Sequence, residues 1–233
     1  MPIRRGPILS VPTLRPFWCY YGGKWRAAPR YPKPRYGTII EPFAGAAGYA
    51  LRYSDREVIL VEKYPVIAEI WRFLIRSSPA DIRLIPCVEH VDALPDATPQ
   101  GAKLLVGFSM NNATTAPRKQ LSSGKRKLAA MGRRRGGWCD AQRNLIAAQV
   151  NAIKHWTIIE GDYSMAPNIE ATWYIDAPYQ RAGVHYIHPA TAIDFELLGL
   201  WCTKRSGQTI VCEAEGAGWL PFKPLPEIGR AHV

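Results

Sequence analysis

Short apolar runs alternate with helical patterns along this chain, and this alternation limits the possible folds more than any other feature. Strands that alternate with helices indicate a parallel sheet with helical crossovers. The expected strands are residues 36–43, 58–61, 103–108, 156–159, 172–175 and 208–212. The expected helical segments are residues 49–53, 65–75, 138–156 and 194–202. The sequence therefore predicts an α/β fold with helices on both faces of the sheet.

Several of the expected strands end at residues that could share one site. Glu41, Glu62, Phe108 and Asp176 all stand at such carboxyl ends. Ligands of parallel sheets bind in the crevice beyond the carboxyl ends of the strands. We therefore expect these four residues, which are far apart in the sequence, to line a common crevice.

The chain has a net charge of +11, and two of its segments carry many Lys and Arg residues without any acidic residue. Residues 1–36, expected to form an extended arm, carry the first cluster of Lys and Arg. Residues 109–138 carry the second cluster of Lys and Arg. Its members are Arg118, Lys119, Lys125, Arg126, Lys127, Arg133, Arg134 and Arg135. Clustering of this kind favours a phosphate-bearing partner over a merely solvated surface.

The cysteines and the hydrophobic pattern exclude several classes of protein. The five cysteines form no close C-x-x-C pair, so neither a metal site nor a disulfide framework is expected. Scattered thiols fit a reducing cytoplasm. No apolar run reaches the roughly 18 residues of a membrane span, and no membrane partner is expected. Pro7 and Pro12 interrupt the basic N-terminus, which argues against a signal peptide.

The motif Asp176-Ala177-Pro178-Tyr179 directly follows an expected strand and suits the binding of a flat ring that carries an amino group. The Asp176 carboxylate and the Ala177 backbone carbonyl can both accept hydrogen bonds from the amine. Pro178 stiffens the loop, and the Tyr179 ring can stack on the flat ring of the ligand. Two acceptors that pull on the amine hydrogens localise its lone pair, which makes the amine a better nucleophile.

Two further segments indicate a cofactor site. Residues 41–48 end a strand and continue in small residues, so a cofactor could approach the backbone at Glu41, Phe43 and Gly45. Glu62 ends the next strand, where an acid commonly accepts hydrogen bonds from ribose hydroxyls; by itself it could equally be a solvated strand end. A Gly-Gly-Lys turn ending at Lys24 could place a cation near a carboxylate, although such a turn alone is more often ordinary.

These segments occur in an order that resembles the Dam-like family of DNA N6-adenine methyltransferases. In that family a Gly-Gly-Lys segment comes first, an E-P-F-x-G segment follows, and a D-P-P-Y segment comes last. The resemblance spans roughly residues 16–215. It implies a Rossmann-like methyltransferase sheet and a catalytic domain of residues 1–108 and 139–233, interrupted by a small DNA-recognition region at residues 109–138.

The resemblance also implies S-adenosylmethionine as the methyl donor and duplex DNA, with the target adenine flipped out, as the partner. Tyr20, Lys24, Glu62 and Asp176 are then expected to contact the cofactor. Asp162 and Tyr163 are candidates for its adenine pocket. The chain departs from the family at Ala177, where proline is usual, and at Glu62, where aspartate is frequent. Alanine keeps the backbone carbonyl, so the chemistry is expected to survive with a less rigid loop.

Other functions remain open at the level of sequence. A methyltransferase of the same fold could act on RNA or on another amino-bearing base, because positive charge recognises phosphate of either kind. A catalytically silent nucleic-acid-binding protein could keep the same fold. Asn111, Asn112, Arg118 and Gln120 could read bases, or residues 109–138 could act as a non-specific clamp. His185 and Tyr186 could touch the flipped base or only shape the loop. An NAD-type dehydrogenase fits poorly because the G-x-G-x-x-G pattern is missing.

Overall fold

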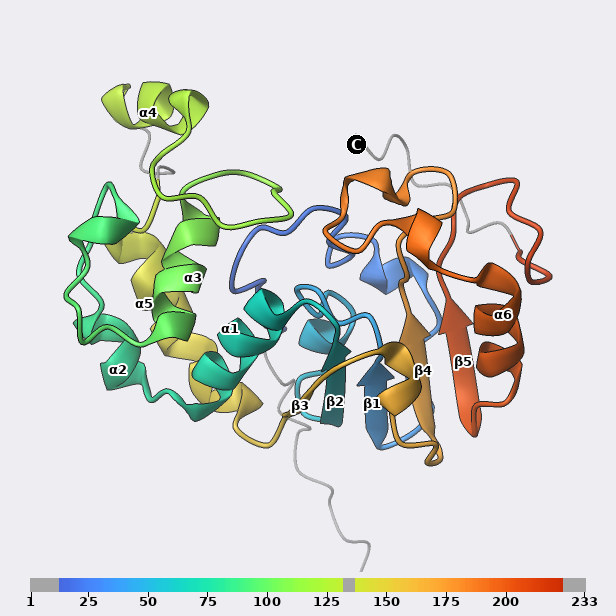
Figure 1. Ribbon diagram of the computed structural model, residues 1–233. Helices are drawn as coiled ribbons and strands as arrows, with labels where there is room; N and C mark the ends of the chain where they lie inside the picture. The colour runs from blue at the N-terminus through green and yellow to red at the C-terminus, as the bar shows by residue number, and fades with distance from the viewer. Residues whose placement is uncertain (1–12, 132–136, 224–233) are drawn as a thin grey trace, which may run out of the picture.

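The computed structural model describes residues 13–131 and 137–223, and it shows an α/β fold built on one parallel sheet (Figure 1). The sheet has five strands in the order β3-β2-β1-β4-β5. Every neighbouring pair is parallel. The strands are β1 (Thr38–Glu41), β2 (Glu57–Glu62), β3 (Thr157–Glu160), β4 (Ala171–Ile175) and β5 (Gly207–Val211). The prediction of a parallel α/β sheet is confirmed.

The strand order reverses direction at the centre of the sheet. β1 pairs with β2 on one side and with β4 on the other, with Ile40 opposite Trp173 in the register of β1 and β4. The chain therefore builds outward from β1 in one direction and from β4 in the other. In open parallel sheets, the crevice at such a switch point is where ligands bind.

Helices cover both faces of the sheet. α1 packs against β2 and β3, and α6 packs against β5. The helices are α1 (Pro65–Arg76), α2 (Pro79–Leu84), α3 (Gln100–Ser109), α4 (Ser123–Ala130), α5 (Asp140–Gln149) and α6 (Phe195–Thr203). In the described part of the chain, no helix combines the length and the apolar character needed to cross a bilayer.

The ends of several helices follow from local sequence. Pro65 occupies the first turn of α1, where its missing N–H costs nothing. Ser78 and Asp81 form a capping box at the start of α2, in which each side chain accepts the backbone N–H of the other. The Asp194 side chain accepts the backbone N–H of Leu197 at 3.0 Å and so caps α6.

The prediction of a strand at residues 103–108 is wrong, because these residues lie in α3. A short apolar run does not distinguish a buried strand from a buried helix. α3 packs tightly on two sides: a Cβ at Gly101 would lie 2.7 Å from the Glu69 carbonyl of α1, and a Cβ at Gly107 would lie 2.8 Å from the Pro117 side chain. Burial on both sides removes the amphipathic period. Phe108 is consequently a core residue and not a strand end.

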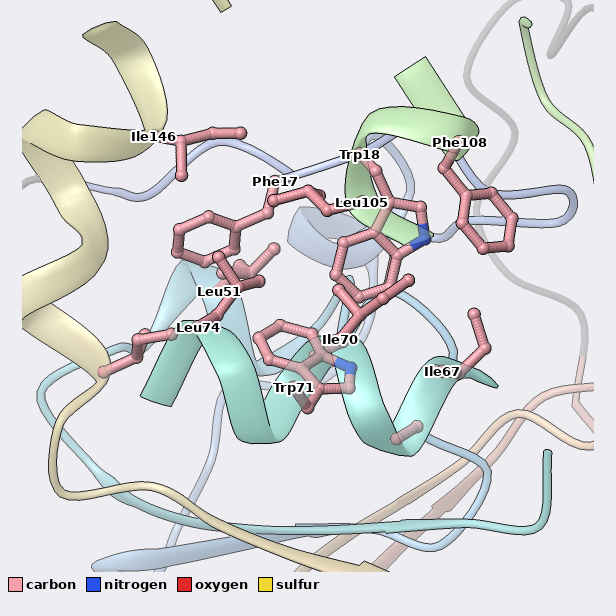
Figure 2. Packing of buried hydrophobic residues seen from close by; sticks show 14 of the residues in the cluster. Phe17, Trp18, Leu51, Ile67, Ile70, Trp71, Leu74, Leu105, Phe108 and Ile146 are labelled. Carbon is pink, nitrogen blue, oxygen red and sulfur yellow. The ribbon is translucent and has the colours of Figure 1, made fainter. Parts of the chain in front are cut away.

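The expected extended arm is part of the core where the structure describes it. Phe17 and Trp18 are buried, and Figure 2 shows both packed against Trp71 of α1. Ring centroids of Phe17 and Trp71 lie 5.8 Å apart, and those of Trp18 and Trp71 lie 5.1 Å apart. Leu105 of α3 and Ile146 of α5 complete this cluster (Figure 2). The helical segments α3 and α5 are thereby fixed to the sheet through α1.

Two other sequence expectations need adjustment. The helix expected at residues 49–53 is a single 3-10 turn, Ala50–Arg52, and the chain enters β2 at Glu57 soon after it. The helix expected at residues 138–156 is α5 followed by a short 3-10 turn, Val150–Ile153. The remaining expected strands and the helices at Pro65 and Asp194 are confirmed, with bounds that differ from the predicted ones by at most two residues.

Candidate functional site

Acidic residues stand at the carboxyl ends of the three central strands. Glu41 closes β1, Glu62 closes β2, and Asp176 directly follows β4. Because the strands are parallel, the three carboxyl groups lie at the same edge of the sheet, on both sides of the switch point. All three line one cavity, so the expected crevice exists, without Phe108.

The Gly-Gly-Lys segment reaches this crevice and pairs with the acid after β4. Lys24 Nζ lies 3.0 Å from Asp176 Oδ1, and the two side chains are only 16% and 18% exposed. The same ammonium donates a hydrogen bond to the Gly22 carbonyl at 2.9 Å. It also lies 4.6 Å from the centroid of the Tyr179 ring, close enough for a cation–π contact. Two motifs separated by most of the chain therefore form one charged cluster.

Gly48 allows the Gly-Gly-Lys segment to lie directly on the loop that follows β1. A Cβ at Gly48 would lie 2.6 Å from the backbone nitrogen of Trp25 and 2.9 Å from that of Lys24. Only glycine leaves enough room for this approach. The small residues after β1 thus serve to position Lys24 as well as to leave space for a ligand.

The local environment of Asp176 controls its charge. Burial raises the pKa of this carboxyl, and the Lys24 ammonium lowers it. Glu213 raises the same pKa, and the Tyr179 side chain lowers it. Glu213 also holds the loop after Asp176, because its Oε2 accepts the backbone N–H of Gln180 at 3.1 Å. Lys24 is therefore the group that favours the ionised, hydrogen-bond-accepting form of Asp176.

Glu41 is a buried residue that holds the loop after β1 in place. Its Oε1 accepts the backbone N–H of Ala50 at 2.6 Å, which fixes the turn after the small-residue loop. Burial raises the pKa of Glu41 to about 8, and the negative charge of Asp176 adds to that shift. The Glu41 carboxyl is therefore largely protonated at neutral pH, which avoids two adjacent buried charges.

Glu62 organises the backbone around the cavity. Its Oε2 accepts the backbone N–H of Gly45 at 2.9 Å, and its Oε1 accepts that of Tyr64 at 2.8 Å. Burial raises the pKa of Glu62, whereas these backbone hydrogen bonds lower it. Each carboxylate oxygen keeps acceptor capacity, so a ribose hydroxyl could still bind here.

Aromatic side chains form the walls of the cavity. The rings of Phe43 and Tyr163 stack with centroids 5.3 Å apart and an interplanar angle of 26°. Tyr20 lies against Gly45, where a Cβ would come within 3.2 Å of the tyrosine ring. Asp162, next to Tyr163, accepts the backbone N–H of Ser164 at 3.2 Å and forms an exposed ion pair with Lys63.

The cavity has a volume of about 300 Å³, within the range of small-molecule sites. All the sequence-predicted cofactor residues line it: Tyr20, Lys24, Glu41, Phe43, Gly45, Glu62, Asp162, Tyr163 and Asp176. Of the other motif residues, Pro178 lines it too, whereas Ala177 is buried. Tyr179 is half-buried and packs against the core near Lys24.

Sequence reasoning missed Tyr174, a buried residue of β4 whose side chain also lines the cavity. Its ring stacks on Tyr49 with centroids 4.3 Å apart and an interplanar angle of 6°. Its hydroxyl has no hydrogen bond of good geometry among the described residues. Tyr174 stands two positions before Asp176, so the alternation of side chains along a strand could have placed both on one face.

The basic residues of the 109–138 segment do not all face solvent. Among the predicted DNA contacts, the exposed cations are Arg118, Lys119, Arg126 and Lys127. Lys125 is buried, with its ammonium donating to the Ser109 carbonyl at 2.5 Å, so it is a structural side chain and not a surface cation. Arg133, Arg134 and Arg135 lie outside the described residues. Figure 1 shows α4 projecting away from the helices around it, at the side toward which the strands point.

No protein-family model matches this chain, and no curated protein matches it. What the site can do must therefore be argued from its own residues. The site combines a buried acid paired with a lysine and a cavity at a switch point, and exposed cations lie elsewhere on the surface, in the 109–138 segment.

Proposed function

We propose that this protein is a DNA adenine methyltransferase, which transfers a methyl group from S-adenosylmethionine to N6 of a flipped-out adenine. The observation that carries the proposal is the Lys24–Asp176 pair in a cavity at the switch point of a parallel sheet. The sheet order and the position of the cavity are compatible with a Rossmann-like methyltransferase domain.

The residues present suit S-adenosylmethionine. The buried Tyr174 hydroxyl has no hydrogen bond of good geometry among the described residues, and Asp176 Oδ1, which is paired with the Lys24 ammonium, can accept a further hydrogen bond. Buried polar atoms of this kind favour a polar ligand. Glu62 has acceptor capacity for ribose hydroxyls, and the stacked pair of Phe43 and Tyr163 offers an apolar wall for an adenine ring.

The chemistry needs no metal. When bound, S-adenosylmethionine would supply an electrophilic methyl group: the amine lone pair would form a bond to the methyl carbon, the carbon–sulfur electrons would return to sulfur, and the amine would give up one proton to water. Asp176 accepts a hydrogen bond from the amine and so localises its lone pair before attack. The Ala177 carbonyl provides the second acceptor. Catalysis of this type depends on positioning and preorganised electrostatics.

The surface charge favours a nucleic acid as the substrate, and we propose DNA. Arg118, Lys119, Arg126 and Lys127 are exposed near α4, and phosphate contacts from such residues orient a duplex without reading its sequence. A base must leave the duplex to reach a buried acid such as Asp176, and unpairing costs a few kcal/mol. Stacking on an aromatic ring offsets part of that cost, and Tyr179 is the ring next to Asp176 in the motif.

The test is transfer of a labelled methyl group from S-adenosylmethionine to duplex DNA, single-stranded DNA and RNA side by side. We expect labelled N6-methyladenine in DNA with the wild-type protein, and a loss of about 100-fold or more with Asp176→Ala. Asp55→Ala is the matched control, because Asp55 is exposed and precedes β2 at the opposite edge of the sheet. Background counts with the wild-type protein on all substrates would refute the proposal.

A further inference from the structure

Two exposed apolar side chains stand in the segment that follows the Asp176–Tyr179 motif. Val184 is 54% exposed and Ile187 is 47% exposed. Ile187 lines the cavity, whereas Val184 does not, so the exposure of Val184 is not that of a cavity wall. Single exposed apolar residues are ordinary, but a pair beside a catalytic motif requires an explanation.

The segment that carries Val184 is fixed at both ends. On one side, the Gly183 N–H donates to the Tyr179 carbonyl at 2.7 Å, and a Cβ at Gly183 would lie 2.8 Å from Pro178. On the other side, the Tyr186 hydroxyl donates to the Tyr21 carbonyl at 3.3 Å. Between these anchors the backbone makes one 3-10 turn, Gly183–His185. Val184 is therefore held out from the surface by a short, tethered turn.

Val184 lies on the outer rim of the cavity. Pro178 and Tyr186, on either side of it in the sequence, line the cavity, whereas Val184 does not. Figure 1 shows the segment after β4 at the edge toward which the strands point, and α4 stands at that same side. A duplex held by the cations near α4 would pass over this rim.

The neighbours of Val184 also suit a nucleic acid. Arg181 is exposed and has no ion pair among the described residues, so its guanidinium is available for a phosphate beside the target base. The His185 ring is exposed and packs edge-on against Tyr21, with centroids 6.0 Å apart. The turn thus presents one apolar side chain close in sequence to a cation that can bind a phosphate.

We propose that Val184 enters the base stack of the duplex in place of the extruded adenine. Apolar side chains inserted between bases unstack them and offset part of the cost of distortion. The inference rests on the proposed function, since it concerns the same adenine. It adds a residue that acts on the duplex and takes no part in methyl transfer. Val184 is therefore a positioning residue.

The methylation site is first mapped by sequencing the modified bases in DNA that has been incubated with the wild-type protein. The experiment then compares Val184→Ala with the wild-type protein on two duplexes that contain this site. One duplex is fully paired, and the other lacks the base opposite the target adenine. We expect Val184→Ala to lose about tenfold in kcat/KM on the paired duplex and less than about twofold on the other. Val184→Leu should keep activity on both, because it retains an apolar side chain. Leu200→Ala, an equally exposed change on α6, is the control and should behave as wild type.

Equal activity of Val184→Ala and the wild type on the paired duplex would overturn the inference. An equal loss on both duplexes would also overturn it, because that result indicates a structural role. In both cases methyl transfer by the wild type leaves the proposed function standing. If the wild type methylates neither duplex, the proposed function fails and the inference fails with it. A rise in 2-aminopurine fluorescence at the target position, lost in Val184→Ala, would support the inference independently.

Discussion

Lys24 and Asp176, which lie far apart in the sequence, form a largely buried ion pair with Nζ and Oδ1 3.0 Å apart. The pair joins the N-terminal segment to the central strand β4 at the switch point of the sheet. It also sets the charge of the carboxyl group, because burial raises the pKa of Asp176 and Lys24 lowers it. The cation therefore determines the pH range in which Asp176 can accept a hydrogen bond from a substrate amine.

Removing that cation should shift the pH dependence of the reaction. In Lys24→Met the pKa of Asp176 rises, because burial and Glu213 then act without an opposing ammonium. The reaction needs the ionised carboxyl, so the acidic limb of the kcat profile should move to higher pH. At neutral pH we expect a loss of roughly tenfold or more. Measurements of kcat at saturating cofactor separate this effect from weaker cofactor binding.

Lys24→Arg is the matched control for this prediction. It keeps the positive charge, so its acidic limb should stay close to that of the wild type, although the geometry of the pair changes. An acidic limb that does not move in Lys24→Met would mean that Lys24 does not set the charge of Asp176 during turnover.

The contact between the two motif loops should depend on Gly48. In Gly48→Ala the new Cβ would lie 2.6 Å from the Trp25 nitrogen and 2.9 Å from the Lys24 nitrogen, so the Lys24 segment must move. We expect a stability loss of about 1–3 kcal/mol and weaker cofactor binding. Urea unfolding and cofactor titration measure both quantities. Gly37→Ala is the control, because a Cβ there meets nothing within 4 Å; equal effects of the two changes would contradict the prediction.

The sequence predicts the strands well where their chemistry is unambiguous. β1 and β4 have β-branched and aromatic residues followed by an acid, and both the strands and the crevice at their ends follow from that pattern. α3 was mistaken for a strand because its residues are buried between α1 and the segment around Pro117, which removes the helical period. Local sequence carries no record of such tertiary packing.

The site, like the fold, could be predicted from the sequence only in part. Residues at strand ends were found because chain topology alone brings them together. The buried state of Lys125 was not found, because a run of Lys and Arg gives no sign of which side chain points inward. Tyr174 was missed because a tyrosine in a strand is an ordinary core residue, and only the structure shows that its hydroxyl has no hydrogen bond of good geometry among the described residues.

Glu41 should make the stability of the protein depend on pH. Its pKa is about 8 in the folded protein, mainly because of burial, against an ordinary value of 4.5. A raised folded pKa contributes stability that is complete below the unfolded pKa and is lost as pH rises through the folded one. The wild type should therefore lose stability between about pH 5 and about pH 9, by roughly 1–3 kcal/mol more than Glu41→Gln.

Urea unfolding at a series of pH values tests the Glu41 prediction. Glutamine keeps an oxygen that can accept the Ala50 N–H, so the turn after β1 should persist in the variant. The difference between the two proteins isolates the contribution of Glu41 from that of the titratable groups that both proteins share. Parallel stability curves for wild type and Glu41→Gln across this pH range would show that Glu41 is ionised in the folded protein.

The exposed cations of the 109–138 segment should set the salt dependence of DNA binding. Each phosphate contact contributes about 0.9 to the slope of log K against log salt. Replacing Arg118, Lys119, Arg126 and Lys127 with glutamine should therefore weaken binding and lower the slope by up to about 3–4 units. Fluorescence anisotropy with a labelled duplex at several salt concentrations measures both effects.

Two kinds of control sharpen this last prediction. Arg76 and Arg83 are exposed at the ends of α1 and α2, away from α4 (Figure 1), and their replacement with glutamine should leave the slope unchanged. Lys125→Met should behave differently again. Its ammonium is buried against the Ser109 carbonyl, so the change should alter stability and leave the slope as in the wild type. If the slope falls as much in the Arg76 and Arg83 variant as in the variant of the 109–138 segment, DNA contacts cations across the surface. The 109–138 segment is then not the main contact surface.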